Sequence, residues 1–209
     1  MSMRTFFSQI MLNIDSIVFK SFLIGIFLLA SSPAIASLFI LFSIILGFKK
    51  NFKNLIKDKL NYLLLIVALI MIFKSMFTSF AETNQIENWD TALNWVGLGN
   101  WIPHFIVYLG AQIYVQSPLQ RSIVAKTLIL STVPVIFSCF TQYILGWYGP
   151  YEFLNGLIIW FQKPLTDLHQ PITGLFNNPN YIGAWIAMIW PILLTYLSQK
   201  KKKGQIPNF

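Results

Sequence analysis

The chain has 209 residues, of which 56% are hydrophobic and only 11% are charged, with a formal net charge of +8 at pH 7. Soluble domains average about 45–50% apolar and about 25% charged residues, so this composition excludes an ordinary soluble domain and indicates an integral membrane protein. The single cysteine excludes an intrachain disulfide and a cysteine-based metal cluster. With only two histidines and seven carboxylates, we expect no metal and no cofactor. We attribute the positive net charge to membrane topology rather than to nucleic-acid binding.

The first apolar region runs from Ile17 to Phe48 and is interrupted at Ser31-Ser32-Pro33. A membrane span needs about 20 apolar residues, so this region is too long for one untilted span. Proline after two serines favours a break, which predicts two short spans over 17–31 and 34–48. A single span is the alternative. A second alternative is a signal peptide cleaved after Ala34-Ile35-Ala36, but the apolar run resumes directly after Ser37.

Four further apolar segments follow, and they predict spans over 61–80, 97–115, 123–145 and 179–198. The predicted fold class is therefore all-α: a polytopic bundle of about six spans forming one membrane domain over 1–209. A loop at 147–172 separates the last two spans and is rich in aromatic residues. Within it, the pattern from Tyr151 to Gln162 suggests a short helix lying in the membrane interface.

The distribution of charges predicts how the spans are oriented in the membrane. With the N-terminus inside, the inner segments carry 13 basic and two acidic residues, while the outer segments carry one basic and five acidic residues. Positive charge gathers on the cytoplasmic side of membrane proteins, so both termini are predicted to be cytoplasmic and the 147–172 loop to face outward. The predicted location is the bacterial inner membrane.

An asparagine-rich turn leads into the last predicted span. Asn178 followed by Pro179 is typical of a helix N-cap with proline in the first turn. A cap needs one asparagine, whereas Asn177, Asn178 and Asn180 crowd this end of the helix. Two interpretations remain open: a capped helix start, or a site whose amides and free N–H groups face an anionic ligand such as a lipid pyrophosphate.

Two other residues are candidates for substrate binding. Lys74 is the clear charge inside a predicted span, so it either reaches toward the outer interface or binds an anionic ligand. Trp160 lies among the aromatic residues of the 147–172 loop, which form either an interfacial belt or a platform for a sugar. No catalytic residue can be named, and His104, Arg121 and Cys139 are interpreted as structural.

The segment Thr173-Gly-Leu-Phe-Asn-Asn-Pro-Asn-Tyr-Ile-Gly-Ala-Trp185 resembles the G-x-F-x-N-P-N motif of the O-antigen ligase and polymerase superfamily. Two upstream segments, Trp95-Val-Gly-Leu-Gly-Asn-Trp-Ile-Pro103 and Gly146-Trp-Tyr-Gly-Pro-Tyr-Glu152, together with Leu154-Asn-Gly-Leu-Ile-Ile-Trp-Phe-Gln162, resemble its cyanobacterial branch. The similarity covers roughly residues 15–200.

The resemblance implies a membrane glycosyltransferase of cell-envelope polysaccharide or lipopolysaccharide biosynthesis. Such proteins transfer a glycan from a polyprenyl-pyrophosphate carrier to a lipid or sugar acceptor at the outer face of the inner membrane, without a metal. Asn177, Asn178 and Asn180 would contact the donor, with Lys74 and Trp160 as further contacts.

The chain departs from the family in three ways. Family members are longer, they carry key arginines and a histidine on a later outer loop, and many have an arginine where this chain has Gln170-Pro171-Ile172. The chain therefore resembles an N-terminal half, with a separate C-terminal half as an expected partner. The alternatives are a transporter or transport-associated protein, as for relatives linked with bicarbonate uptake, or an inactive truncated fragment. The apolar segment from Ile189 to Leu197 disfavours the transporter.

Overall fold

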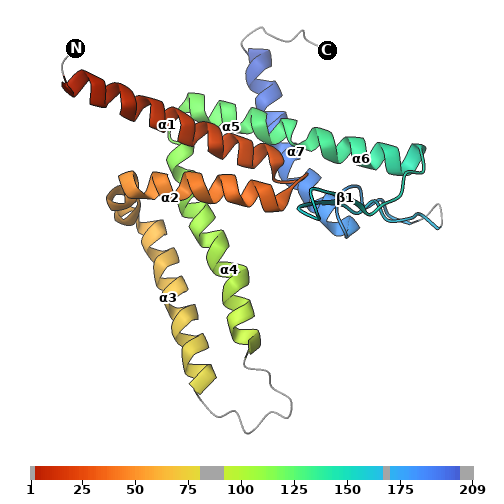
Figure 1. Cartoon of the computed structure of the whole chain (residues 1–209), viewed down its shortest axis with the longest axis horizontal. Coiled ribbons are helices and arrows are strands. Elements are labelled where there is room, and N and C mark those ends of the chain that lie inside the picture. The colour runs from red at the N-terminus through yellow and green to blue at the C-terminus, as the bar shows by residue number, and fades with distance from the viewer. Residues whose placement is uncertain (1–2, 81–91, 167–169, 203–209) are drawn as a thin grey trace. The chain divides into compact units, whose positions relative to one another are not determined.

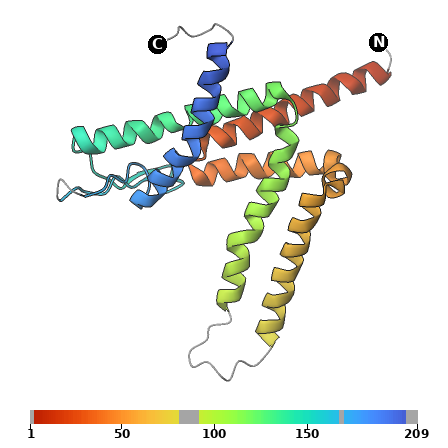
Figure 2. The ribbon, with the colours of Figure 1, turned by 180° about the vertical axis from the view of Figure 1, so that it is seen from behind.

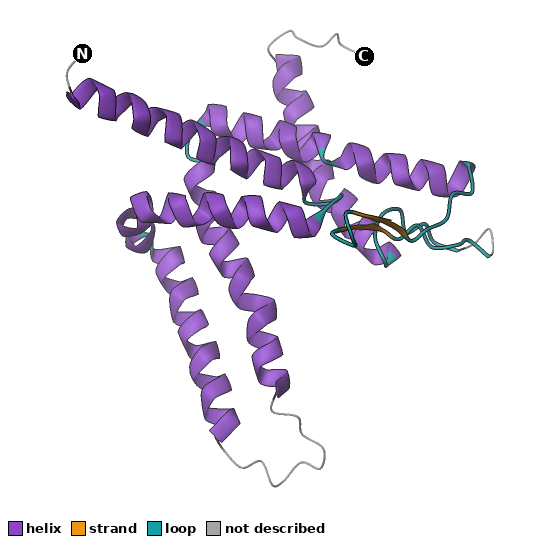
Figure 3. Cartoon of the chain, viewed as in Figure 1, coloured by secondary structure: helices purple, strands orange, loops and turns teal. Residues whose placement is uncertain are grey.

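A computed structural model describes residues 3–80, 92–166 and 170–202. Within these residues the chain is mostly helical, with one small sheet (Figures 1 and 3). The helices are α1 Met3–Leu28, α2 Pro33–Lys57, α3 Lys59–Phe80, α4 Ala92–Ala111, the short 3-10 helix η1 Gln112–Tyr114, α5 Pro118–Leu130, α6 Thr132–Ile144 and α7 Pro179–Lys202. Strands β1 Tyr151–Phe153 and β2 Ile158–Trp160 form an antiparallel hairpin. Four of the five acidic residues that were assigned to the outer segments, Glu82, Glu87, Asp90 and Asp167, lie outside the described residues, as does Lys203.

The six predicted spans lie mostly in helices, but among the described residues fewer helical stretches are suited to crossing a membrane than the six predicted. Among the described residues, three stretches are long and apolar enough: Lys59–Phe80, Pro118–Ile144 and Pro179–Lys200. A fourth results if Pro33–Lys49 and Asn51–Lys57, which meet at 79°, count as one broken span. These helices indicate a membrane protein. The six-span layout and the cytoplasmic termini stay predictions.

Two helix breaks follow directly from proline positions. α1 ends at Leu28 and α2 begins at Pro33, so the predicted break at Ser31-Ser32-Pro33 is present. The predicted span over 123–145 is divided between α5 and α6 at Ser131, three residues before Pro134. Proline lacks the N–H that would bond to the carbonyl of residue 130, and its ring crowds that carbonyl, so the break precedes it.

The described contacts group the chain into two compact units, Met1–Ser43 with Val115–Phe209, and Ile44–Tyr114. In the first unit, α1 packs on α5, and α7 crosses α5 and α6, as the two opposite views show (Figures 1 and 2). α1 also lies close to the first half of α2, because Ser21 Oγ donates a hydrogen bond to the Phe39 carbonyl at 3.1 Å. The buried core of this unit contains Ala30, Val135, Leu175, Trp185 and Ile189.

Helix α6 reverses the amphipathicity of a soluble helix. Its buried face is mainly polar and consists of Thr132, Val135, Ser138, Thr141 and Gln142. Its exposed face is apolar and includes Val133, Ile136, Phe137, Phe140 and Ile144, each more than half exposed. Polar side chains that face protein and apolar side chains that face outward are expected where the surrounding solvent is lipid.

In the second unit, α3 and α4 pack side by side and are joined at one end by a reciprocal amide pair. Asn61 Nδ2 donates to Gln112 Oε1 at 2.9 Å, and Gln112 Nε2 donates to Asn61 Oδ1 at 2.8 Å. Asn61 Nδ2 also donates to the Leu55 carbonyl at 2.9 Å, and the Asn61 side chain is 1% exposed. The pair therefore fixes how α3 and the η1 turn meet.

Replacing Asn61 with leucine is expected to lower the free energy of unfolding by about 1 kcal/mol, because the half-buried amide of Gln112 loses its partner. The double variant Asn61→Leu/Gln112→Leu should lose less than the sum of the two single variants, since it leaves neither amide unpaired. Thermal unfolding in detergent measures this, with Tyr62→Leu on the exposed side of α3 as the control. Strict additivity of the two single variants would contradict the pairing.

Candidate functional site

The 147–172 loop forms a β-hairpin rather than the interfacial helix predicted for Tyr151–Gln162, so that prediction was wrong (Figure 3). Tyr151 pairs with Trp160, and Phe153 pairs with Ile158. The turn between them contains Asn155 and Gly156, both with positive φ of 54° and 84°. Asn-Gly is the preferred pair for tight hairpin turns, and the flanking aromatic and β-branched residues favour strands.

Gln142, at the end of α6, holds the backbone that precedes the asparagine-rich turn. Its Oε1 accepts hydrogen bonds from the backbone N–H groups of Thr173 at 3.1 Å and Gly174 at 2.8 Å. Its Nε2 donates to the Lys163 carbonyl at 2.8 Å and to Thr173 Oγ1 at 3.1 Å. Gln142 is fully buried, so one side chain satisfies polar groups of two loop segments.

Gln162 makes the complementary connection from the loop back to α6. Its Nε2 donates to the Ser138 carbonyl at 2.9 Å and to Thr141 Oγ1 at 2.7 Å. Its backbone N–H donates to the Gly174 carbonyl at 2.9 Å, and its carbonyl accepts from the Gly149 N–H at 2.9 Å. We call Ser138, Thr141, Gln142, Gln162 and Thr173 the amide network; it fixes the base of the hairpin and the segment 173–175 against one face of α6.

Gly174 meets a steric requirement at the centre of this arrangement. Its φ is +53°, a region that disfavours residues with a Cβ. A Cβ at this position would also lie 2.8 Å from Cys139 Sγ and 3.0 Å from Ser138 Oγ. The glycine of the Gly-Leu-Phe-Asn-Asn-Pro-Asn segment therefore allows the backbone to lie directly on α6.

The asparagine turn, residues 177–180, connects this segment to α7. Asn178 Oδ1 accepts a hydrogen bond from the Asn180 N–H at 2.9 Å, and α7 begins at Pro179, so the predicted N-cap is confirmed. Asn177 and Asn180 are exposed, and their side chains make no hydrogen bond with the part of the chain that the structure describes. Two of the three amides are thus available to a ligand at the start of a long helix.

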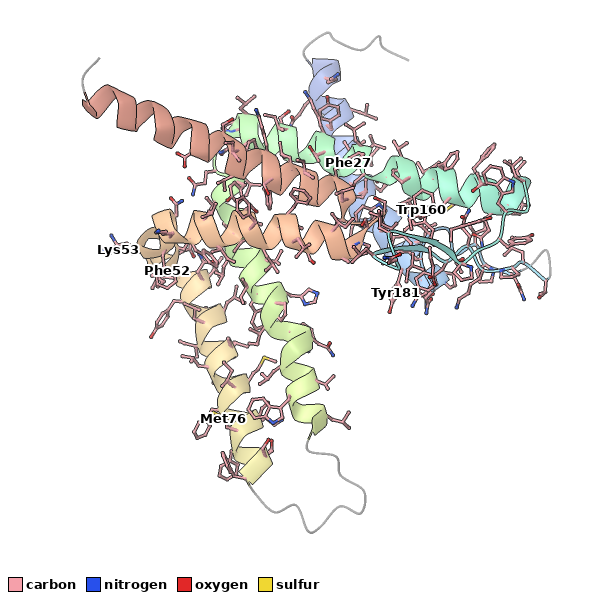
Figure 4. All side chains as sticks on the ribbon, viewed as in Figure 1. Phe27, Phe52, Lys53, Met76, Trp160 and Tyr181 are labelled. Atoms are coloured by element: carbon pink, nitrogen blue, oxygen red, sulfur yellow. The ribbon has the colours of Figure 1, made fainter. Side chains whose placement is uncertain are left out.

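Trp160 is a packing residue of this region. Its indole N–H donates to the Ser31 carbonyl at 2.9 Å, and its ring packs on the core that contains Leu175 and Trp185. Phe153 meets it edge-on at 6.2 Å between ring centroids. Figure 4 marks Trp160 on β2 and Tyr181 in the first turn of α7. A role for Trp160 in sugar binding stays a prediction, and its N–H already has a protein partner.

More exposed aromatic rings lie on the same loop. Trp147 is 51% exposed, Phe153 is 49% exposed and Tyr148 is 41% exposed. Because flat apolar sugar faces stack on aromatic rings, these three are better placed than Trp160 to contact a glycan. They are equally suited to a lipid interface.

Lys74 belongs to the second unit. It lies on the exposed side of α3, between Phe73 and Phe77, which are 71% and 66% exposed. Its side chain has no hydrogen bond or ion pair with any described residue. A lysine on an apolar helix face is suited to extending its ammonium toward the interface, and a role in binding an anion stays a prediction. In the same unit, His104 is exposed and its Nδ1 donates to the Asn100 carbonyl at 2.6 Å, and its structural role stays a prediction.

The sequence-based reasoning missed Gln142, Gln162 and Thr173. One signal for them exists, because Ser138, Thr141 and Gln142 follow one another at helical spacing within an apolar segment. Polar residues on one face of a membrane helix point to buried protein contacts. Their partners lie 21 to 32 residues away in the loop, and no local pattern identifies those partners.

Among the described residues, no group of three or more histidine, cysteine or acidic side chains is arranged to hold a metal ion. Comparison of the chain with protein-family models, with curated proteins and with solved structures found no match.

Proposed function

We propose that the chain is part of a membrane glycosyltransferase of the O-antigen ligase type, acting at the outer face of the bacterial inner membrane. Its donor is a glycan on a polyprenyl-pyrophosphate carrier, and its acceptor is a lipid or a sugar. The acceptor hydroxyl attacks the anomeric carbon of the glycan, the bond from that carbon to the pyrophosphate oxygen breaks, and the hydroxyl proton leaves. Cell-envelope polysaccharide or lipopolysaccharide biosynthesis is the process that uses this reaction.

One observation carries the proposal: Asn178 alone caps α7, while the amides of Asn177 and Asn180 remain exposed and unpaired among the described residues. A side-chain amide donates two hydrogen bonds, and the helix dipole favours negative charge near the N-terminal end of α7. A pyrophosphate offers the matching acceptors. The amide network holds the preceding segment in place, so the two amides are supported by a well-connected backbone.

The asparagine turn offers groups that can bind the donor, but it contains no residue that can act as a general base. From Thr173 to Trp185 the sequence contains no carboxylate and no imidazole. A group that removes the acceptor proton must therefore come from elsewhere, and we assign it to a separate C-terminal half, in line with the resemblance. Lys74 is a weaker candidate for donor binding.

The test distinguishes the capping role of Asn178 from the proposed ligand-binding role of Asn177 and Asn180. The variant Asn177→Ala/Asn180→Ala keeps the Asn178 cap and is expected to reduce glycan transfer by about 10²-fold or more, because donors aimed at the leaving group are lost. Transfer is measured in membranes from a deletion strain complemented with each variant, as the ratio of carrier-linked to transferred glycan. Protein in the membrane fraction is measured alongside.

The matched control is Asn178→Ser, which keeps a capping oxygen and is expected to retain most of the transfer. If the double alanine variant transfers glycan normally while remaining in the membrane, the turn is only a helix cap and the proposal fails. A deletion strain with unchanged glycan transfer would also contradict it.

A further inference from the structure

A groove of about 520 Å³ lies between α1 and the first half of α2, within the first unit. Five hydrophobic side chains line it: Ile17, Ile24, Leu38, Phe39 and Phe42. Leu38 is 67% exposed and Ile17 is 58% exposed. Ser21 also lines the groove, but its hydroxyl already donates to the Phe39 carbonyl. The floor is therefore a surface for hydrocarbon, with few free polar groups.

Lys20 adds one positive charge to this apolar groove. It is exposed and has no hydrogen bond or ion pair with any described residue. Side chains on a helix lean toward the helix N-terminus, so the Lys20 ammonium extends toward the end of the groove formed by Ile17 and Phe42. The groove thus combines an apolar length with a cation toward one end.

We infer that this groove binds an anionic phospholipid of the bilayer, with an acyl chain along Ile24, Leu38 and Phe39 and the phosphate beside Lys20. The occupant must be apolar along most of its length and negative at one end. Anionic phospholipids have this form, and basic sites between membrane helices are known to select them. A protein segment would need an acidic residue placed against Lys20, whereas the bilayer supplies phosphates along its whole surface. The site is independent of the proposed glycan transfer.

The experiment measures lipid binding to the purified full chain by native mass spectrometry in a neutral detergent. Dioleoyl-phosphatidylglycerol and dioleoyl-phosphatidylcholine are titrated separately. We expect phosphatidylglycerol to bind more tightly, and Lys20→Gln to weaken its binding about fivefold, which corresponds to the loss of one lysine near an anionic headgroup. Binding of phosphatidylcholine should not change in this variant.

Two further variants make the result specific. Lys53→Gln removes the same charge from an exposed residue of α2 that does not line the groove and should leave both affinities unchanged (Lys53 is labelled in Figure 4). Leu38→Trp places a large ring in the groove and should reduce the binding of both lipids. Equal affinity of the wild-type chain for the two lipids, or preserved selectivity in Lys20→Gln, would overturn the inference. If a polyprenyl monophosphate displaces phosphatidylglycerol at a concentration below that of the phospholipid, the groove binds a carrier lipid and the assignment to a phospholipid is overturned.

Discussion

Replacing Gln142 with leucine is expected to lower the free energy of unfolding by about 3–5 kcal/mol. The substitution removes four hydrogen bonds in a fully buried position. It leaves the buried N–H groups of Thr173 and Gly174 without a partner, and each buried unsatisfied group costs about 1–3 kcal/mol. It also removes the hydrogen bond to the carbonyl of Lys163, an exposed residue. Leucine is close in size to glutamine, so the loss reports the polar contacts rather than a cavity. Thermal unfolding of the purified chain in detergent measures the change.

The neighbouring residue provides the control for this experiment. Tyr143 is 59% exposed on the apolar face of α6, so Tyr143→Leu should change stability by less than about 0.5 kcal/mol. If the Gln142→Leu and Tyr143→Leu variants unfold at the same temperature, the amide network does not hold the loop. Under the proposed function, Gln142→Leu should also lose glycan transfer, because the asparagine turn loses its support.

The second large effect is expected in the other unit, at Gly110 of α4. A Cβ built on Gly110 would contact the side chain of Ile44, with distances of 2.7 Å to Cγ2 and 2.8 Å to Cδ1. Ile44 is 1% exposed and β-branched, so it has little freedom to move aside. Overpacking of this kind costs about 1–3 kcal/mol and occasionally more, which exceeds the gain of about 1 kcal/mol for alanine over glycine in a helix. We expect Gly110→Ala to lose about 2 kcal/mol.

A rescue experiment tests the cause of that loss. Ile44→Ala alone should be destabilising, since it empties a packed site. Added to Gly110→Ala, it should cost clearly less than it does alone, because the new methyl occupies part of the space that is freed. Unfolding of the four proteins in detergent gives the coupling free energy. Additive effects would show that Gly110→Ala acts through the backbone and not through Ile44.

The helices could be predicted because their formation depends on residues that are close together in the sequence. A long apolar run such as Leu63–Phe73 has no charge and forms a helix in any membrane setting, and Pro33 and Pro179 mark helix starts by their own chemistry. The cap at Asn178 was predictable for the same reason. The number of spans was harder to predict, because α2 bends and because composition does not decide whether a short helix crosses the membrane.

The arrangement of the loop could not be predicted in this way. Its aromatic residues were interpreted as one face of an interfacial helix, whereas Asn155-Gly156 already carried the signal for a tight turn. The sequence left Trp160 with two interpretations, an interfacial belt or a sugar platform, and no local pattern indicated that its indole N–H donates to the Ser31 carbonyl, 129 residues earlier. Contacts over such separations are determined by the assembled core.

The 129 residues between Ser31 and Trp160 also affect when this contact can form during synthesis of the chain. The Ser31 carbonyl lies between α1 and α2 and meets the Trp160 indole only after 129 further residues have been made. At about 5–20 residues per second, this takes roughly 6–26 s. Throughout that interval α1 and the first half of α2 exist without the contact that Trp160 of β2 later makes. The Ser31 carbonyl must therefore stay accessible until Trp160 has been synthesised.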